Sequence, residues 1–181
     1  MKKQSIQKPF FKVLIHQRHL IHYRYMRDTT LLFLIKKEGD NITDICLAMK
    51  KRGFGVGRYN GVGGKVESGE TIEEAVKREA FEEAGAIVGT IHKCAELAFT
   101  FPHKEDWNQL VHVYFTDSWH GEIIETEEMD PLWFRVADIP YQSMWPDDIF
   151  WLPKVLEGEQ VRARFVFAEG DVIIDKEVTC S

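Results

Sequence analysis

The chain has 181 residues, 44% of them hydrophobic, and a formal net charge of −6 at pH 7. That length favours a single domain with a sizeable core, and no apolar run approaches the roughly 18 residues that a membrane helix needs. The three cysteines, Cys46, Cys94 and Cys180, are widely spaced, which predicts free thiols in a reducing compartment. The composition therefore argues against a membrane protein, a disulfide framework and a zinc site.

A basic extension, residues 1–28, precedes the predicted domain, which covers residues 29–181. Seven of the 23 Lys and Arg residues and none of the 29 acidic residues lie within residues 1–27. The remaining body is strongly acidic, which argues against a nucleic-acid polymer as the substrate. The extension resembles a mitochondrial transit peptide in charge, but it is lysine-rich and holds a single serine. We expect a cytoplasmic protein, with a mitochondrial or nuclear location as the alternative.

From residue 29 onward, apolar runs and turn residues predict alternating strands and helices. A glycine-rich loop is expected at residues 50–61, and a polar loop at 102–108. Strands are predicted at residues 31–35, 45–49, 93–101, 110–119 and 132–134, a second helix at 147–156, and a closing hairpin at 162–167 and 172–178. This order predicts an α+β fold or an α/β/α sandwich.

The first helix is bounded by recognisable start and stop signals. Thr71 and Glu74 have the spacing of a capping box, so the helix should begin just after Thr71. Gly85 stands where a left-handed residue would end it.

That helix carries three clustered carboxylates. At about 100° per residue, Glu79, Glu82 and Glu83 share one wedge beside the apolar face. Such groups repel one another unless cations neutralise them, and Mg²⁺ prefers oxygen ligands and also binds substrate phosphates. A solvated acidic face is the alternative reading of the three glutamates alone.

The stretch from Gly64 to Ala86 matches a known motif, the Nudix box. Every constrained position is filled, by Gly64, Glu70, Arg78, Glu79, Ala80, Glu82, Glu83, Gly85 and Ala86. The chain thus resembles the Nudix hydrolases, which cleave nucleoside diphosphates linked to another group. The resemblance implies an α/β/α sandwich with a mixed sheet.

The flanking sequence narrows this resemblance. Residues 47–65, 129–134 and 144–148 look like the animal-type oxidised purine nucleoside triphosphatases, the MutT-related 8-oxo-dGTP diphosphatases. Tyr59 and Val62 stand where that group has a larger tryptophan and phenylalanine. The loop at residues 102–111 also differs and offers Trp107 or Gln109 at the pocket rim. Pro102 is placed as in ADP-ribose-cleaving members, so a hydrolase of ADP-ribose or another nucleoside diphosphate derivative is the alternative.

The resemblance implies a site with two ends. Its metal ligands correspond to Glu79, Glu82, Glu83, Glu128 and the Gly63 carbonyl. Its substrate-binding positions correspond to Thr30, Lys50, Phe54, Asn60, Val62, Gly63, Gly64, Lys65, Phe99, Phe101, Trp145, Pro146, Asp147 and Asp148. The chemistry of the residues agrees, since a tryptophan stacks on a purine while Asn and Asp read its edge. The Trp-Pro-Asp-Asp element also has a purely structural reading as a helix start.

The implied reaction converts oxidised purine nucleoside triphosphates, of the 8-oxo-dGTP and 2-hydroxy-dATP type, to monophosphate and pyrophosphate. Mg²⁺, or Mn²⁺ in its place, would assist a monomeric enzyme acting on the nucleotide pool. One of Glu79, Glu82 and Glu83 is expected to help deprotonate the attacking water, and Arg78 to orient a carboxylate. Which glutamate is the base, and whether the α- or β-phosphorus is attacked, stays open.

Overall fold

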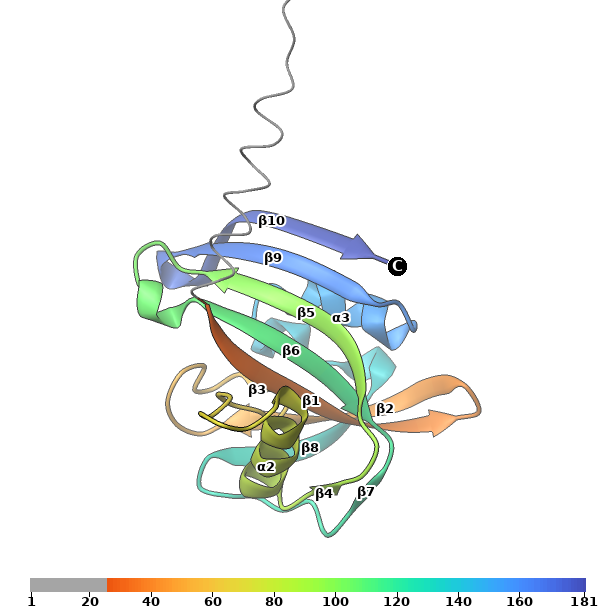
Figure 1. Ribbon diagram of the computed structural model, residues 1–181. Helices are drawn as coiled ribbons and strands as arrows, with labels where there is room; N and C mark the ends of the chain where they lie inside the picture. The colour runs from red at the N-terminus through yellow and green to blue at the C-terminus, as the bar shows by residue number, and fades with distance from the viewer. Residues whose placement is uncertain (1–25) are drawn as a thin grey trace, which may run out of the picture.

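The computed structural model describes residues 26–181 (Figure 1). The basic extension, with the regularly spaced His16, His19 and His22, therefore lies almost entirely outside the described residues. The first strand, β1 (Arg27–Glu38), begins two residues before the predicted domain boundary.

A mixed sheet of eight strands forms the centre of the fold. Its order is β10-β9-β5-β6-β1-β2-β3, and β8 also pairs with β2. The strands after β1 are β2 (Asn41–Lys50), β3 (Tyr59–Asn60), β5 (His92–Thr100), β6 (Gln109–Thr116), β8 (Met129–Arg135), β9 (Val161–Ala168) and β10 (Val172–Cys180). The pairs β1–β6 and β5–β9 are parallel and the other pairs antiparallel, which confirms the predicted mixed sheet.

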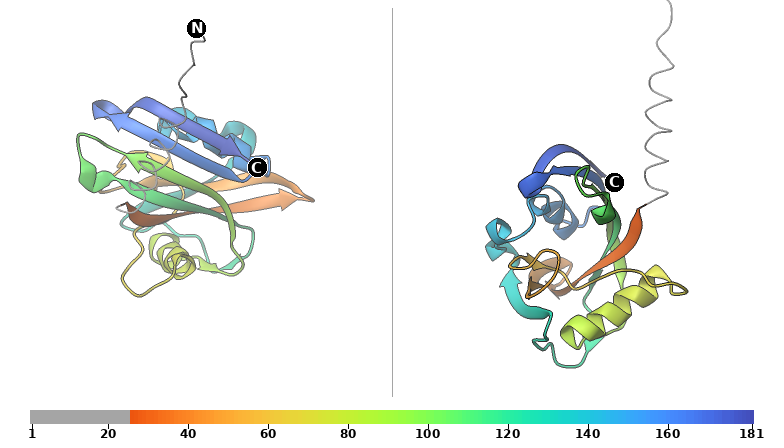
Figure 2. Two further views of the ribbon diagram at one scale, coloured as in Figure 1. Left: turned by 45° about the horizontal axis from the view of Figure 1, so that its top comes forward. Right: turned by 90° about the vertical axis from the view of Figure 1, so that its left-hand side faces the viewer.

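Within the described residues, two α-helices cover opposite faces of the sheet (Figure 2): α2 (Ile72–Ala84) and α3 (Asp148–Leu156). The apolar run of β1 serves both layers. Leu31 and Phe33 pack in the cluster that contains Trp151 of α3, whereas Leu32 and Leu34 pack in the cluster that contains Ala80 of α2. Because successive side chains point to opposite faces, a continuous apolar strand indicates burial on both sides. The predicted sandwich is confirmed.

The predicted ends of helix α2 are confirmed. The Thr71 hydroxyl accepts from the Glu74 backbone N–H at 3.2 Å, and the Glu74 carboxylate accepts from the Thr71 N–H at 2.7 Å. Gly85 follows the helix with φ of +71°, the left-handed conformation that glycine adopts without strain.

The short elements were not predictable from periodicity. The two-residue strands β3, β4 (Ile87–Val88) and β7 (Trp119–His120) are too short to show an alternating pattern, and β7 separates from β6 within one predicted strand. Four 3₁₀ turns were also not predicted: η1 (Glu105–Trp107), which lies in the predicted loop at 102–108, η2 (Val136–Asp138), η3 (Tyr141–Ser143) and η4 (Glu169–Asp171).

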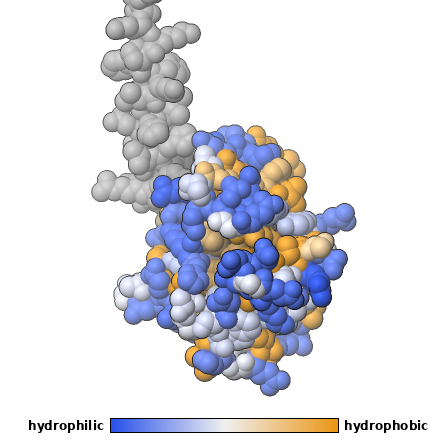
Figure 3. All heavy atoms as spheres, turned by 90° about the vertical axis from the view of Figure 1, so that its right-hand side faces the viewer, coloured by the Kyte–Doolittle hydropathy of each residue, from blue (hydrophilic) through white to orange (hydrophobic). Residues whose placement is uncertain are grey.

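The surface is mostly polar. The face in Figure 3 is largely hydrophilic, with apolar residues in scattered patches. In the part of the chain that the structure covers, no helix has the length and apolar character to cross a membrane.

Replacing Thr71 by Ala should remove the capping-box hydrogen bond from the Glu74 N–H to the Thr71 hydroxyl, while the Thr71 backbone N–H can still donate to the Glu74 carboxylate. We expect the free energy of unfolding to fall by about 1 kcal/mol, the usual contribution of such a cap. Urea denaturation measures the change, with Thr90→Ala as the control because Thr90 is also exposed but lies outside any helix. Equal stabilities of the two variants would contradict this role for the cap.

Candidate functional site

A cavity of about 770 Å³ runs between helix α2 and the start of helix α3. Its volume lies within the range of small-molecule sites. The predicted residues that line it are Thr30, Lys50, Phe54, Asn60, Gly63, Gly64, Lys65, Glu79, Glu82, Glu83, Phe99, Phe101, Glu128, Trp145, Asp147 and Asp148. Val62 and Pro146 do not line it; Val62 is buried under α2, where it bonds to the backbone of Leu32 on β1.

Arg78 organises the acidic end of this cavity. Its Nη1 atom donates to Glu79 at 2.8 Å and to Glu82 at 3.1 Å, and its Nη2 atom donates to Glu70 at 2.7 Å. Burial raises the pKa of Glu79, while the Arg78 guanidinium beside it acts in the opposite direction. Arg78 thus holds three carboxylates of the box in place, the orienting role that the sequence suggests.

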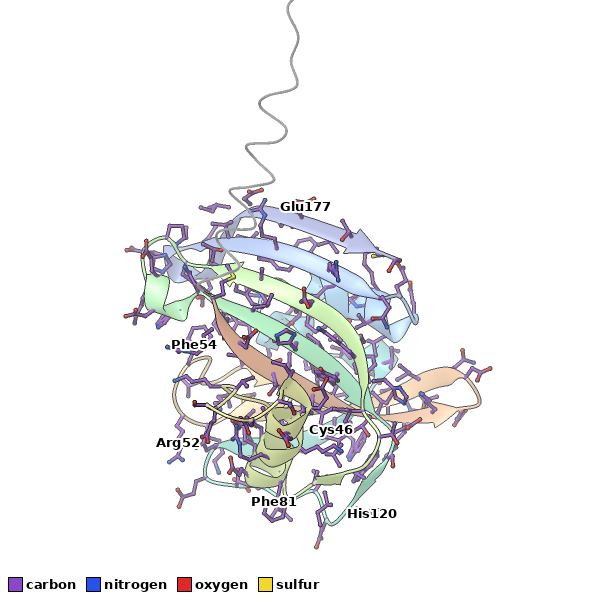
Figure 4. The ribbon with its side chains drawn as sticks, viewed as in Figure 1. Cys46, Arg52, Phe54, Phe81, His120 and Glu177 are labelled. Carbon is purple, nitrogen blue, oxygen red and sulfur yellow. The ribbon has the colours of Figure 1, made fainter. Side chains whose placement is uncertain are left out.

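Glu83 is the most deeply buried of the three helix glutamates, with 4% of its surface exposed. One carboxylate oxygen accepts from the Gly63 N–H at 2.8 Å, and the other accepts from the Lys50 ammonium at 2.8 Å. Lys50 also lies 3.5 Å from Glu128. A hydrogen bond from Arg52, which projects from the same loop as Phe54 (Figure 4), lowers the pKa of Glu128. The buried charge of Glu83 is therefore compensated on both oxygens.

Two glycines allow the loop to reach these carboxylates. A Cβ on Gly64 would overlap the Glu79 carboxylate, and a Cβ on Gly63 would overlap the backbone carbonyl of Thr30. Thr30 in turn donates its N–H to the Gly64 carbonyl at 2.8 Å, which fixes the loop to β1. A side chain at position 63 would therefore collide with the β1 backbone, and one at position 64 would displace the Glu79 carboxylate.

The acidic end fits a divalent cation by its chemistry. Every candidate ligand is an oxygen, the donor type that Mg²⁺ and Mn²⁺ prefer. The Lys50 ammonium already places a positive charge between Glu83 and Glu128, and Arg78 does so between Glu79 and Glu82. As the side chains of residues 26–181 stand, no three acidic, histidine or cysteine groups converge on one point. Binding a cation therefore requires some of these ion pairs to open.

The opposite end of the cavity carries a set of directional polar groups. The Asn60 amide oxygen accepts from the Gly61 N–H at 2.9 Å, which leaves its NH₂ group as the donor toward a ligand. Asp147 accepts from the Trp151 indole N–H at 3.0 Å, and Asp148 accepts from the Trp145 backbone N–H at 3.0 Å. The bond between Asp148 and the Trp145 N–H lies at the start of α3. The Trp-Pro-Asp-Asp element therefore starts the helix, and its Trp145, Asp147 and Asp148 also line the cavity.

The two aspartates are almost fully buried, with 3% and 2% of their surfaces exposed. Burial raises the pKa of Asp147 to about 7. Burial and then repulsion from Asp147 raise the pKa of Asp148 well above its ordinary value. Because two adjacent buried carboxyls cannot both ionise cheaply, the pair retains a proton at neutral pH and can donate as well as accept.

Aromatic rings wall this end. Phe101 stacks on Phe167 with 5.3 Å between ring centroids, and Phe99 stacks on Phe165 at 5.7 Å, so both predicted wall residues also belong to the α3-side core. At the rim, Gln109 lines the cavity, whereas Trp107 packs edge-on against Phe54.

Several lining residues were not among the predicted ones, and Arg27, Trp151 and Phe167 are examples. Trp151 and Phe167 read as core residues in the sequence because they lie in apolar segments. Arg27 falls inside the segment interpreted as an extension. No local pattern marks any of them, since their place in the site depends on how strands and helices far apart in sequence meet.

The buried aspartates should make stability depend on pH. Their folded-state pKa values are raised, so the folded protein binds more protons than the unfolded chain between about pH 4 and 7. The contribution of the two aspartates to the free energy of unfolding is fully present below the pKa that they have in the unfolded chain. It is lost as pH rises through the higher pKa that they have in the folded protein. We expect the free energy of unfolding to decline from pH 5 to 8, and Asp147→Asn to make that decline shallower by up to about 1.4 kcal/mol per pH unit. Urea titrations at several pH values test this, with the exposed Asp138→Asn as the control; parallel curves for wild type and Asp147→Asn would contradict it.

The family model for the NUDIX domain matches residues 25–155. The chain is 45% identical over 130 residues to the oxidized purine nucleoside triphosphate hydrolase of Mus musculus, covering 72% of this chain and 83% of that protein. It is 43% identical over 134 residues to the protein of the same description from Danio rerio, covering 74% and 85%. Its fold resembles that of a MutT protein from Bacillus halodurans, with a TM-score of 0.72, 20% identity and coverage of 84% and 97%. The resemblance read from the Nudix box is confirmed, and the chain belongs to the Nudix family of hydrolases.

Proposed function

We propose that this protein hydrolyses oxidised purine nucleoside triphosphates to monophosphate and pyrophosphate, and so removes damaged bases from the nucleotide pool. One observation carries the proposal: a single cavity joins the glutamates of α2 to the buried Asp147–Asp148 pair. A nucleotide has this same division into an anionic end and a flat polar end. The mouse and zebrafish relatives, described as hydrolases of such triphosphates, support it. We further propose that the protein acts as a cytoplasmic monomer.

At the base end, the residues offer donors and acceptors on one edge and an aromatic face beside it. Asn60 presents its NH₂ group, and the singly protonated aspartate pair presents an O–H donor next to acceptor oxygens. The Trp145 indole supplies the surface on which a purine stacks. Moving one proton within the aspartate pair exchanges donor and acceptor, which suits both oxidised guanine and oxidised adenine.

At the phosphate end, Nudix hydrolases generally use divalent metal ions. We propose Mg²⁺ here, with Mn²⁺ as a substitute, held by Glu79, Glu82, Glu83, Glu128 and the Gly63 carbonyl. The bound cations would neutralise phosphate charge and lower the pKa of a coordinated water. Arg78 keeps Glu79 and Glu82 oriented, and one of the helix glutamates takes the proton of the attacking water. Lys50, once released from Glu83, would bind the phosphate chain together with Thr30 and Lys65, and the lining of one cavity by all three residues supports this role.

A turnover panel tests the substrate class. It compares 8-oxo-dGTP, 2-hydroxy-dATP, dGTP, dATP, ADP-ribose and a capped RNA in the presence of Mg²⁺. We expect kcat/KM for an oxidised purine triphosphate to exceed that for the normal triphosphate by about tenfold or more, the effect of one well-formed buried hydrogen bond. A higher kcat/KM for ADP-ribose or capped RNA would overturn the proposal. Hydrolysis of the best substrate in ¹⁸O-labelled water then identifies the phosphorus atom attacked.

The helix glutamates should differ in their effect on stability but not on turnover. Glu82→Gln and Glu83→Gln should each lower kcat by about 100-fold or more, because each removes a charge that the reaction needs. The Glu82 side chain is 56% exposed and its loss should leave the unfolding midpoint unchanged, whereas Glu83→Gln strands the Lys50 ammonium and should lower it.

Glu73→Gln is the matched control, since Glu73 lies on the same helix but outside the cavity. Turnover of both variants close to that of the control, with Mg²⁺ as the only metal, would refute the proposed centre.

A further inference from the structure

Arg58 joins three parts of the chain beside the base end of the cavity. It lies in the loop between β2 and β3, and its Nη1 atom donates to the Met144 carbonyl at 2.7 Å. Its Nη2 atom donates at 2.8 Å to Asp171, which lies in the turn between β9 and β10. The guanidinium carbon also lies 4.6 Å from the centroid of the Trp145 ring, a cation–π contact.

Two side chains lie against the Trp145 indole. The Phe54 ring stacks on it with 4.9 Å between centroids and 24° between the planes. The Arg58 guanidinium and the Phe54 ring thus both lie within 5 Å of the indole centroid. A purine that stacks on Trp145 competes with these two groups for the indole.

The two covering groups are held very differently. The Arg58 guanidinium is fixed by two hydrogen bonds, one to the Met144 carbonyl and one to Asp171, and the second is also an ion pair. Asp171 has a positive φ of +60°. Phe54 is 43% exposed and stands between Gly53 and Gly55, with φ values of +77° and +81°. The Phe54 face is thus the one that can open to a ligand.

We propose that Arg58 is the positioning residue of the base end: it holds one face of the Trp145 indole through its bridge to Asp171 and Met144, and so leaves the Phe54 face for the purine. This inference rests on the proposed function and extends it to a residue that touches neither base nor phosphate. Arg58 contacts the Trp145 indole two residues before the Asp147–Asp148 pair.

The same cation influences the aspartate pair. Burial dominates the raised pKa of both carboxyls, and the Arg58 charge opposes that rise at each of them. The other groups that face the pair are the Trp151 and Trp145 N–H donors and the Tyr141 hydroxyl, whose own pKa is raised by burial and by Asp148. Arg58 is thus the cation that acts on the pair, and removing it should raise the pH at which the pair loses its proton.

Three substitutions separate the roles of Arg58. Arg58→Gln removes both the positive charge and the guanidinium that bridges Met144 and Asp171. Arg58→Lys keeps the charge but loses the planar guanidinium with its several N–H donors. Asp171→Asn keeps the guanidinium but removes its ion pair. Arg164→Gln is the matched control, because Arg164 forms a 2.8 Å ion pair with Asp175 in the same hairpin. Each variant is measured for kcat and KM with 8-oxo-dGTP from pH 6 to 9. The Asp147 and Asp148 carboxyls are titrated by ¹³C NMR without substrate.

We expect Arg58→Gln to raise KM about tenfold with kcat changed less than about twofold. We also expect it to shift the carboxyl titration to a pH higher by about 0.5. Arg58→Lys should raise KM without moving the titration, and Asp171→Asn should raise KM less than Arg58→Gln does. A KM and a titration of Arg58→Gln equal to those of Arg164→Gln would overturn the inference. A wild type inactive on 8-oxo-dGTP would instead refute the proposed function, and the substrate-free titration would still decide the role of Arg58.

Discussion

The structure of the site depends on one buried charge, the Glu83 carboxylate. Its two oxygens are held by the Gly63 N–H and the Lys50 ammonium, so helix α2, the glycine loop and strand β2 meet at a single group. A buried carboxylate without such partners would be costly, and the close approach of the loop to β1 that supplies the Gly63 N–H requires glycine at position 63. In this chain the Nudix box places several carboxylates where Arg78, Lys50 and the Gly63 N–H compensate their charge.

The carboxyl groups at the two ends of the cavity have different partners. Near α2, the Arg78 and Lys50 side chains form ion pairs with Glu70, Glu79 and Glu83. Near α3, Asp147 and Asp148 lie among aromatic rings with only N–H donors in contact, and burial favours their neutral forms. A charged end suits cations and phosphates, and a neutral hydrogen-bonding end suits a base. This contrast is the physical basis for assigning the two halves of a nucleotide to the cavity.

The sequence predicted the parts of the fold that rest on local rules. The capping box at Thr71, the end at Gly85 and the long apolar strands follow from spacing alone, and the structure contains them. The two-residue strands β3, β4 and β7 have no such signal. Many site residues were identified through resemblance, and the structure gathers most of them, but Val62 packs under α2 instead of lining the cavity. The contact of Arg58 with Trp145 and Asp171 joins residues separated by 87 and 113 positions, so no local pattern could reveal it.

We propose that the aspartate pair reads the base by sharing one proton. The most direct measurement is kcat/KM for 8-oxo-dGTP and for 2-hydroxy-dATP from pH 6 to 9, in wild type, Asp147→Asn and Asp148→Asn. An amide fixes the donor pattern, so we expect each variant to change the two substrates by unequal factors and to lose the wild-type pH dependence. Equal losses for both substrates, with the pH profile unchanged, would contradict the claim.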